Sequence, residues 1–168
     1  MRKILPPLAI AFLVYACSSM MKVQESNGSV ATNSSDTSYS TTRLTLIEEA
    51  KKLAGSKYKY GGTSTKGFDC SGFTSYVYNK AGMAIPRSSS AQAQKGTKIT
   101  QGAAQPGDLL FFRFKKKDNI SHVAMVVSND KNGMQIIHST TSKGVMMEDI
   151  SASKYWQEKL LFGRRYVE

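Results

Sequence analysis

One cysteine and two histidines carry most of the nucleophilic and acid–base chemistry available to this chain. Beyond residue 17 the sequence holds a single cysteine, Cys70, and the whole chain has two histidines, His122 and His138. A thiol is a strong nucleophile once it is ionised, and imidazole is the side chain best suited to take its proton near neutral pH. The combination indicates nucleophilic catalysis by a cysteine–histidine pair.

Cys70 is expected in the first turn of a helix. Residues 70–81 (CSGFTSYVYNKA) predict the helix, Asp69 occupies its N-cap position, and Gly82 follows its end. Unpaired backbone N–H groups and the helix dipole favour an anion there, and with a nearby imidazolium they lower a thiol pKa to about 3.5–7.5. We therefore expect an activated thiol, against the alternative of an inert, buried cysteine.

The two histidines fall on two consecutive predicted strands. His122 opens the apolar stretch HVAMVV, His138 lies near the end of IIHS, and the turn SNDKNG separates them. Adjacent antiparallel strands can bring the two rings side by side, so that His122 pairs with the thiol and His138 orients His122. Two alternatives stay open, namely two structural histidines or a zinc site formed with Cys70. Zinc is disfavoured because no short Cys-x-x-Cys or His-x-x-x-His pair is present.

The remaining pattern predicts an α+β domain at residues 43–168. Leu44, Ile47, Ala50 and Leu53 recur at helical spacing within residues 43–54, ahead of Gly55. Short strands follow, linked by Asn, Asp and Gly turns, so we expect N-terminal helices packed on an antiparallel sheet of about five strands. The predicted strands are 108–114, 121–128, 134–139, 143–149 and 161–167, with a short helix at 152–159.

The N-terminal residues predict export and lipid anchoring. Arg2 and Lys3 precede an apolar run at 4–16, whose 13 residues are too few to cross a bilayer core of about 30 Å as a helix. Ala16 followed by Cys17 resembles a lipoprotein signal, so we expect removal of residues 1–16 and acylation of Cys17; the alternative is an ordinary secretory signal. Residues 17–42 predict a flexible tether, because 15 of the 25 residues at 18–42 are Ser, Thr, Asn or Gly.

The charge of the chain points to an anionic partner. The formal net charge is +11, and loss of residues 1–16, which contain two basic and no acidic residues, leaves +9. Such a charge steers association with an anionic polymer that carries carboxylates. It could also suit nucleic acid, but no nucleic-acid-binding motif is present, and we expect no such partner.

Five sequence blocks together resemble a known family, the NlpC-type cell-wall cysteine peptidases, which have a papain-like fold. The blocks are YKYGGTSTKGFDCSGF (58–73), IPRSSSAQ (85–92), QPGDLLFF (105–112), SHVAMVV (121–127) and MQIIHS (134–139). With the lipoprotein signal, the layout is similar to Spr-type murein endopeptidases. The resemblance covers residues 43–168.

The resemblance implies a role for each residue of the site. It maps Cys70 onto the nucleophile, His122 onto the general base and His138 onto the orienting third residue. Further residues match positions that line the site or contact the stem peptide, and these are Tyr58, Asp69, Ser71, Arg87 and Ser88. Each of these also has a structural alternative, such as an N-cap for Asp69 and a solvated surface position for Arg87.

The expected activity is that of a cysteine endopeptidase acting on peptidoglycan stem peptides through a thioacyl-enzyme, with no metal or cofactor. The scissile bond is γ-D-glutamyl–diaminopimelate or D-alanyl–diaminopimelate. The alternatives are an N-acetylmuramoyl-L-alanine amidase and a non-catalytic wall-binding lipoprotein. We expect a monomer in the bacterial envelope, anchored through lipid on Cys17, at the periplasmic side of the outer membrane in preference to the inner membrane.

Overall fold

The computed structural model of the chain describes residues 34–116 and 119–168. In this part of the chain an antiparallel sheet runs in the order β3-β8-β4-β5-β6-β7, and β1 and β2 form a separate hairpin. The helices are α1 (Ser34–Lys52), α2 (Cys70–Lys80), α3 (Ser89–Gln92) and α4 (Lys154–Gln157). The strands are β1 (Thr63–Ser64), β2 (Gly67–Phe68), β3 (Thr97–Ile99), β4 (Leu109–Phe112), β5 (His122–Asp130), β6 (Gly133–Thr140), β7 (Gly144–Asp149) and β8 (Leu160–Arg165).

The α+β prediction is confirmed, with one more strand in the main sheet than expected. The five predicted strands correspond to β4 to β8, and the sixth is the short edge strand β3. β3 pairs with β8 through residues 97–99 only. A three-residue edge strand that is largely exposed has no alternating hydrophobic pattern, so the sequence gives little sign of it.

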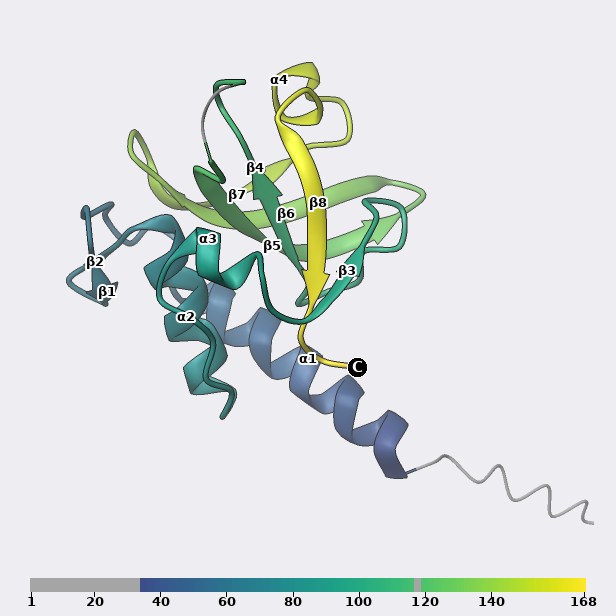
Figure 1. The fold of residues 1–168 in the computed structure, drawn as a ribbon. Helices are drawn as coiled ribbons and strands as arrows, with labels where there is room; N and C mark the ends of the chain where they lie inside the picture. Colours follow the sequence, from purple (N-terminus) through teal and green to yellow (C-terminus); the bar gives the residue numbers. More distant parts are fainter. Residues whose placement is uncertain (1–33, 117–118) are drawn as a thin grey trace, which may run out of the picture. The chain divides into compact units, whose positions relative to one another are not determined.

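The sheet is covered on both faces, which explains why all four residues of β4 are buried. One face packs against α1 and α2, with Phe111 and Met125 among the residues that meet the helices. The other face carries a second cluster that includes Leu110, Phe112 and Trp156 of α4. Figure 1 shows α1 and α2 together on one side of the sheet and α4 near the end of the domain away from α1.

Helix α1 is longer than predicted. It begins at Ser34, so residues 34–42 are helical and the prediction of a flexible tether is wrong for them. Leu46, Ala50 and Leu53 are buried against the core, whereas Leu44, predicted to face it, is 62% exposed. Once such a buried segment is fixed, each further helical residue adds a hydrogen bond without a new nucleation cost, which allows the helix to extend.

The predicted signal segment 1–16, Cys17 and the tether up to residue 33 lie outside the described residues. Among the residues that the structure does describe, no helix is long and apolar enough to cross a membrane.

Candidate active site

Cys70 is the first residue of α2, as predicted. Asp69 is the N-cap: its backbone is extended (φ −87°, ψ 177°), and its Oδ1 accepts a hydrogen bond from the N–H of Gly72 at 2.7 Å. Gly72 is required for space, because a Cβ there would lie 2.0 Å from the carbonyl oxygen of Gly62. The loop before the helix therefore packs tightly onto its first turn and fixes where Cys70 emerges.

The thiol of Cys70 is free and half-buried. Burial raises its pKa, although the backbone N–H groups of Val123, Ser71 and Cys70 itself favour the thiolate. The expectation of a depressed thiol pKa is therefore not met in the resting site. The sequence indicates the helix N-terminus, but it does not reveal how far the surrounding chain removes the sulfur from water.

His122 and His138 are in direct contact, as the strand pattern predicted. Nε2 of His122 and Nδ1 of His138 lie 3.0 Å apart, and both side chains are buried. The register of β5 and β6 pairs Met125 with Ile137, which makes the two histidines diagonal neighbours across the strands. Burial lowers the pKa of both imidazoles, so both are neutral at neutral pH.

Cys70 and His122 line one cavity of about 420 Å³. Helix α2, which begins at Cys70, packs against β5, the strand that begins at His122. The rest of the lining comes from the loop before α2, residues between β4 and β5, the end of β6, the β6–β7 turn, β7 and α4. It comprises Tyr58, Phe114, Ser121, Ser139, Thr140, Thr141, Ser142, Lys143, Met146, Glu148, Tyr155 and Trp156.

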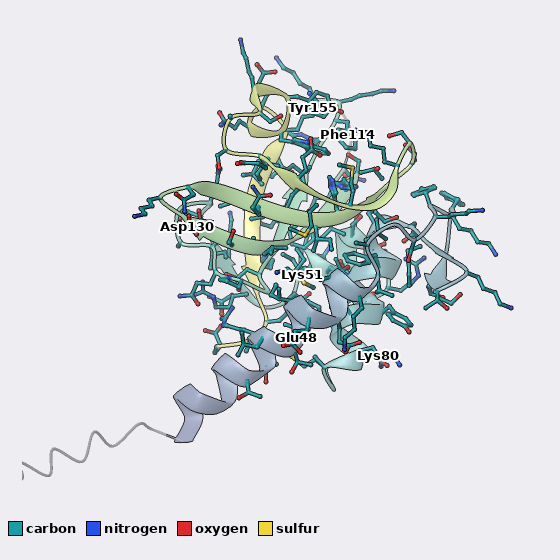
Figure 2. The ribbon with its side chains drawn as sticks, turned by 180° about the vertical axis from the view of Figure 1, so that it is seen from behind. Glu48, Lys51, Lys80, Phe114, Asp130 and Tyr155 are labelled. Carbon is teal, nitrogen blue, oxygen red and sulfur yellow. The ribbon has the colours of Figure 1, made fainter. Side chains whose placement is uncertain are left out.

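One wall of this cavity is aromatic, a feature that was not predicted from the sequence. Trp156 stacks on the ring of His122, with centroids 5.7 Å apart and an interplanar angle of 28°. Phe114 and Tyr155 lie beside it, their centroids 6.4 Å apart. Figure 2 shows these two side chains next to each other, at the end of the domain away from Glu48 and Lys51 of α1. The available signal was the only tryptophan of the chain, within the predicted helix 152–159.

Three of the five predicted substrate-contact residues form a charged cluster beside the N-terminus of α2. Arg87 donates from Nη2 to Asp69 Oδ2 at 2.6 Å and from Nη1 to Asp69 Oδ1 at 3.0 Å. Nη1 of Arg87 also lies 3.0 Å from Oγ of Ser71. Partial burial acts to raise the pKa of Asp69, but the hydrogen bonds from Arg87 and Gly72 outweigh it, and the pKa is lowered.

The other two predicted contact residues are separate from this cluster. Tyr58 is half-buried and lines the cavity, where burial and the adjacent Cys70 raise the pKa of its phenol. Ser88 is the N-cap of α3 and accepts a hydrogen bond from the N–H of Ala91 at 3.3 Å. The lining of the cavity includes Tyr58 but not Ser88 or the Asp69 cluster.

In the described part of the chain, no three His, Cys, Asp or Glu side chains gather in a way that could hold a metal ion. The structure of these residues therefore offers no set of ligands for the zinc alternative. Nε2 of His122 and Nδ1 of His138 are instead engaged with each other.

Comparison with known proteins matches residues 55–165 to the NlpC/P60 family. The chain is 41% identical over 119 residues to the probable endopeptidase p60 of Listeria seeligeri, which covers 71% of this chain and 21% of that protein. It is 40% identical over 124 residues to a gamma-D-glutamyl-L-lysine dipeptidyl-peptidase of Bacillus cereus, covering 73% of this chain and 36% of the relative. The chain thus spans about a third or less of these relatives.

The fold agrees with solved structures. The crystal structure of an NlpC/P60 family protein from Bacillus cereus superposes with a TM-score of 0.68 at 34% sequence identity, over 75% of this chain and 40% of that one. The papain-like, NlpC-type fold expected from the sequence blocks is therefore confirmed. The family match runs from Gly55, just after α1, to Arg165, the last residue of β8, and this chain belongs to the NlpC/P60 family.

Proposed function

We propose that the chain is a cysteine endopeptidase that cleaves amide bonds in the stem peptides of peptidoglycan. The observation that carries this proposal is the shared cavity lined by Cys70 of α2 and His122 of β5, with His138 in contact with His122. These are the nucleophile, base and orienting residue that amide hydrolysis through a thioacyl-enzyme needs. The names of the relatives, an endopeptidase and a γ-D-glutamyl peptidase, support the same reaction class.

The reaction begins from a neutral thiol and a neutral imidazole, since burial raises the pKa of Cys70 and lowers that of His122. Because Nε2 of His122 is engaged with His138, its Nδ1 is the nitrogen left to accept the thiol proton. As Sγ attacks the substrate carbonyl, that proton passes to His122, and the two opposite charges stabilise each other.

His122 then donates its proton to the leaving amine, which leaves the acyl group on Cys70 as a thioester. A water molecule, deprotonated by His122, attacks this thioester and releases the carboxylic acid product and the thiol. The backbone N–H groups of Cys70 and Ser71 belong to the first turn of α2, where they have no partner within the helix, and are the donors we propose for the oxyanion.

The cluster of Asp69, Arg87 and Ser71 supports a role in binding the polar part of the stem peptide. Arg87 is 43% exposed while its partner Asp69 is 15% exposed, so the guanidinium presents an accessible donor surface next to the helix that carries Cys70. Arginine is well suited to bind a substrate carboxylate in a bidentate manner. Tyr58 and the aromatic wall line the cavity that contains the thiol and contribute further contacts.

The location follows from the sequence rather than from the described residues. We propose a protein of the bacterial envelope, lipid-anchored through Cys17, whose net positive charge favours approach to the anionic wall. We propose that it acts as a monomer and has no nucleic-acid partner.

Mass spectrometry of purified muropeptides digested by the full chain tests the proposal. An endopeptidase splits the stem peptide and produces a new amino terminus within it. An N-acetylmuramoyl-L-alanine amidase instead releases intact stem peptides and free glycan, and a wall-binding protein sediments with sacculi without releasing either. Release of intact stems, or no release under reducing conditions, contradicts the endopeptidase assignment; Cys70→Ala is the matched control and should release nothing.

A further inference from the structure

Glu148 of β7 presents its carboxylate to the nitrogen of His138 that faces away from His122. Oε2 of Glu148 lies 3.4 Å from Nε2 of His138, whose side chain is fully buried, while the side chain of Glu148 is 34% exposed. The register of β6 and β7 pairs His138 with Met146 and Ile136 with Glu148. His138 and Glu148 are therefore diagonal neighbours on one face of the sheet, within reach of a long side chain.

The far nitrogen of His138 needs a partner. Among the described residues, Nε2 of His138 is a buried polar side-chain atom with no hydrogen bond of standard geometry. The carboxylate of Glu148 is in position to accept from it, and a small change in the Glu148 side chain shortens the 3.4 Å separation to a normal hydrogen bond. Even without that change, a negative charge at this distance favours a proton on Nε2.

The position of this proton on His138 determines which nitrogen of His122 carries a proton. If Nε2 of His138 carries the proton, its Nδ1 is an acceptor, and Nε2 of His122 must donate to it across the 3.0 Å contact. Nδ1 of His122 is then unprotonated and ready to act as a base toward Cys70. The opposite tautomer of His138 would donate from Nδ1 and leave His122 with its remaining proton on Nδ1, the wrong nitrogen for that role.

We propose that Glu148 is a positioning residue that holds His138 in the Nε2–H tautomer and stabilises the positive charge that develops on His122 during catalysis. This inference rests on the proposed roles of Cys70 and His122. The titratable or charged groups around the histidine pair are Cys70 of α2, Glu148 of β7 and, in the same cavity lining, Tyr58, Lys143 and Tyr155. Of these, Glu148 is the group whose carboxylate lies next to His138 and favours its protonated form.

Two substitutions in the full chain separate the charge of Glu148 from its ability to accept a hydrogen bond. Glu148→Gln keeps an acceptor of the same length and removes the charge, whereas Glu148→Met removes both. With a purified muropeptide we expect kcat to fall about tenfold in the Gln variant, the equivalent of one pKa unit, and further in the Met variant. KM should stay within about twofold, because the effect acts through His138 and not on bound substrate.

The pH dependence supplies a readout that a purely structural role does not move. Glu148 favours the protonated imidazole, so its neutralisation should shift the acid limb of kcat to lower pH by about one unit. Glu158→Gln removes the same charge from an exposed position, where Glu158 pairs with Lys154 at 3.9 Å, and should leave the rate and the profile unchanged.

Nitrogen NMR of the two histidines in the free protein tests the tautomer without reference to activity. In the native chain at neutral pH both imidazoles should be protonated at Nε2 only, whereas Glu148→Met should show His138 as a mixture of tautomers. If Cys70→Ala is inactive but both Glu148 variants retain the native kcat, acid limb and tautomers, the role of Glu148 is wrong and the proposed function stands. A rise in KM with an unchanged kcat in the Glu148 variants also overturns the positioning role of Glu148. Undiminished cleavage by Cys70→Ala would overturn the proposed function itself.

Discussion

Ser139 donates its hydroxyl to the carbonyl oxygen of Phe68 at 2.8 Å, in a buried hydrogen bond between segments 71 residues apart in the sequence. Ser139 follows His138 on β6, and Phe68 lies two residues before Cys70. One hydrogen bond therefore joins the strand that carries His138 to the loop that precedes Cys70. The relative position of the nucleophile and its base depends on this junction.

Replacing Ser139 by Ala should weaken both the fold and the site. The carbonyl of Phe68 loses its partner in a buried place, so we expect the free energy of unfolding to fall by about 1–3 kcal/mol in urea titrations. We expect kcat/KM to fall as well, because the loop before Cys70 loses its tie to β6. Ser64→Ala, in the exposed strand β1, is the matched control. Native values of both quantities in Ser139→Ala would show that the junction is not needed.

Asp69 combines two roles that substitution can separate. Asp69→Asn retains an oxygen that accepts from the N–H of Gly72 but loses the charged pair with Arg87. We expect its unfolding free energy to stay near the native value while KM for muropeptides rises several-fold. Asp69→Ala should in addition lose about 1 kcal/mol of stability, the usual contribution of an N-cap. An unchanged KM in both variants would leave Asp69 with a capping role alone.

The activity of the enzyme should follow a broad bell-shaped pH profile. The active form holds one proton shared by the thiol and imidazole, and burial lowers the pKa of His122 while raising that of Cys70. The acid limb of kcat/KM should therefore lie below 6.5, the ordinary histidine value, and the alkaline limb above 9.0, the ordinary cysteine value. These limits belong to the pair and not to either group alone. If Cys70 and His122 instead formed a thiolate–imidazolium pair before substrate binds, the acid limb would follow the ionisation of the cysteine, with a pKa well below 9.0. Iodoacetamide would then alkylate Cys70 rapidly at pH 5.

The histidine pair should also make stability depend on pH. Burial holds the pKa of both imidazoles below 6.5, so between 6.5 and those lowered values the unfolded chain binds more protons than the native one. The free energy of unfolding then has its full value above pH 6.5. It falls as the pH decreases, by up to about 1.4 kcal/mol per pH unit for each histidine. His138→Asn removes one of these groups and should give a shallower dependence in urea titrations. The same slope in both proteins would contradict the assignment.

Much of the site could be predicted from the sequence, because its main parts are set by local patterns. Asp69 before a helical stretch places Cys70 at a helix N-terminus, and two apolar strands joined by a turn bring His122 and His138 together. Both predictions are confirmed by the N-cap geometry and the 3.0 Å imidazole contact. The catalytic roles of these residues stay predictions.

The features of the site that could not be predicted from the sequence depend on contacts between distant segments. Trp156 reaches His122 from a four-residue helix after β7, and Glu148 reaches His138 only through the β6–β7 register. The raised pKa of Cys70 likewise comes from burial by the whole domain. Helix α1 extends back to Ser34 although its Ser- and Thr-rich start is typical of a tether, because packing of its later residues fixes the helix.

Hydroxylamine trapping tests the central claim, a thioacyl intermediate on Cys70, most directly. Hydroxylamine competes with water for a thioester, so the native chain digesting a muropeptide should yield a peptide hydroxamate together with the free acid, detected by mass spectrometry. The amine product should appear at an undiminished rate, and Cys70→Ala should yield none of the three. Formation of the free acid alone at every hydroxylamine concentration, or the same products from Cys70→Ala, would contradict the thioacyl mechanism.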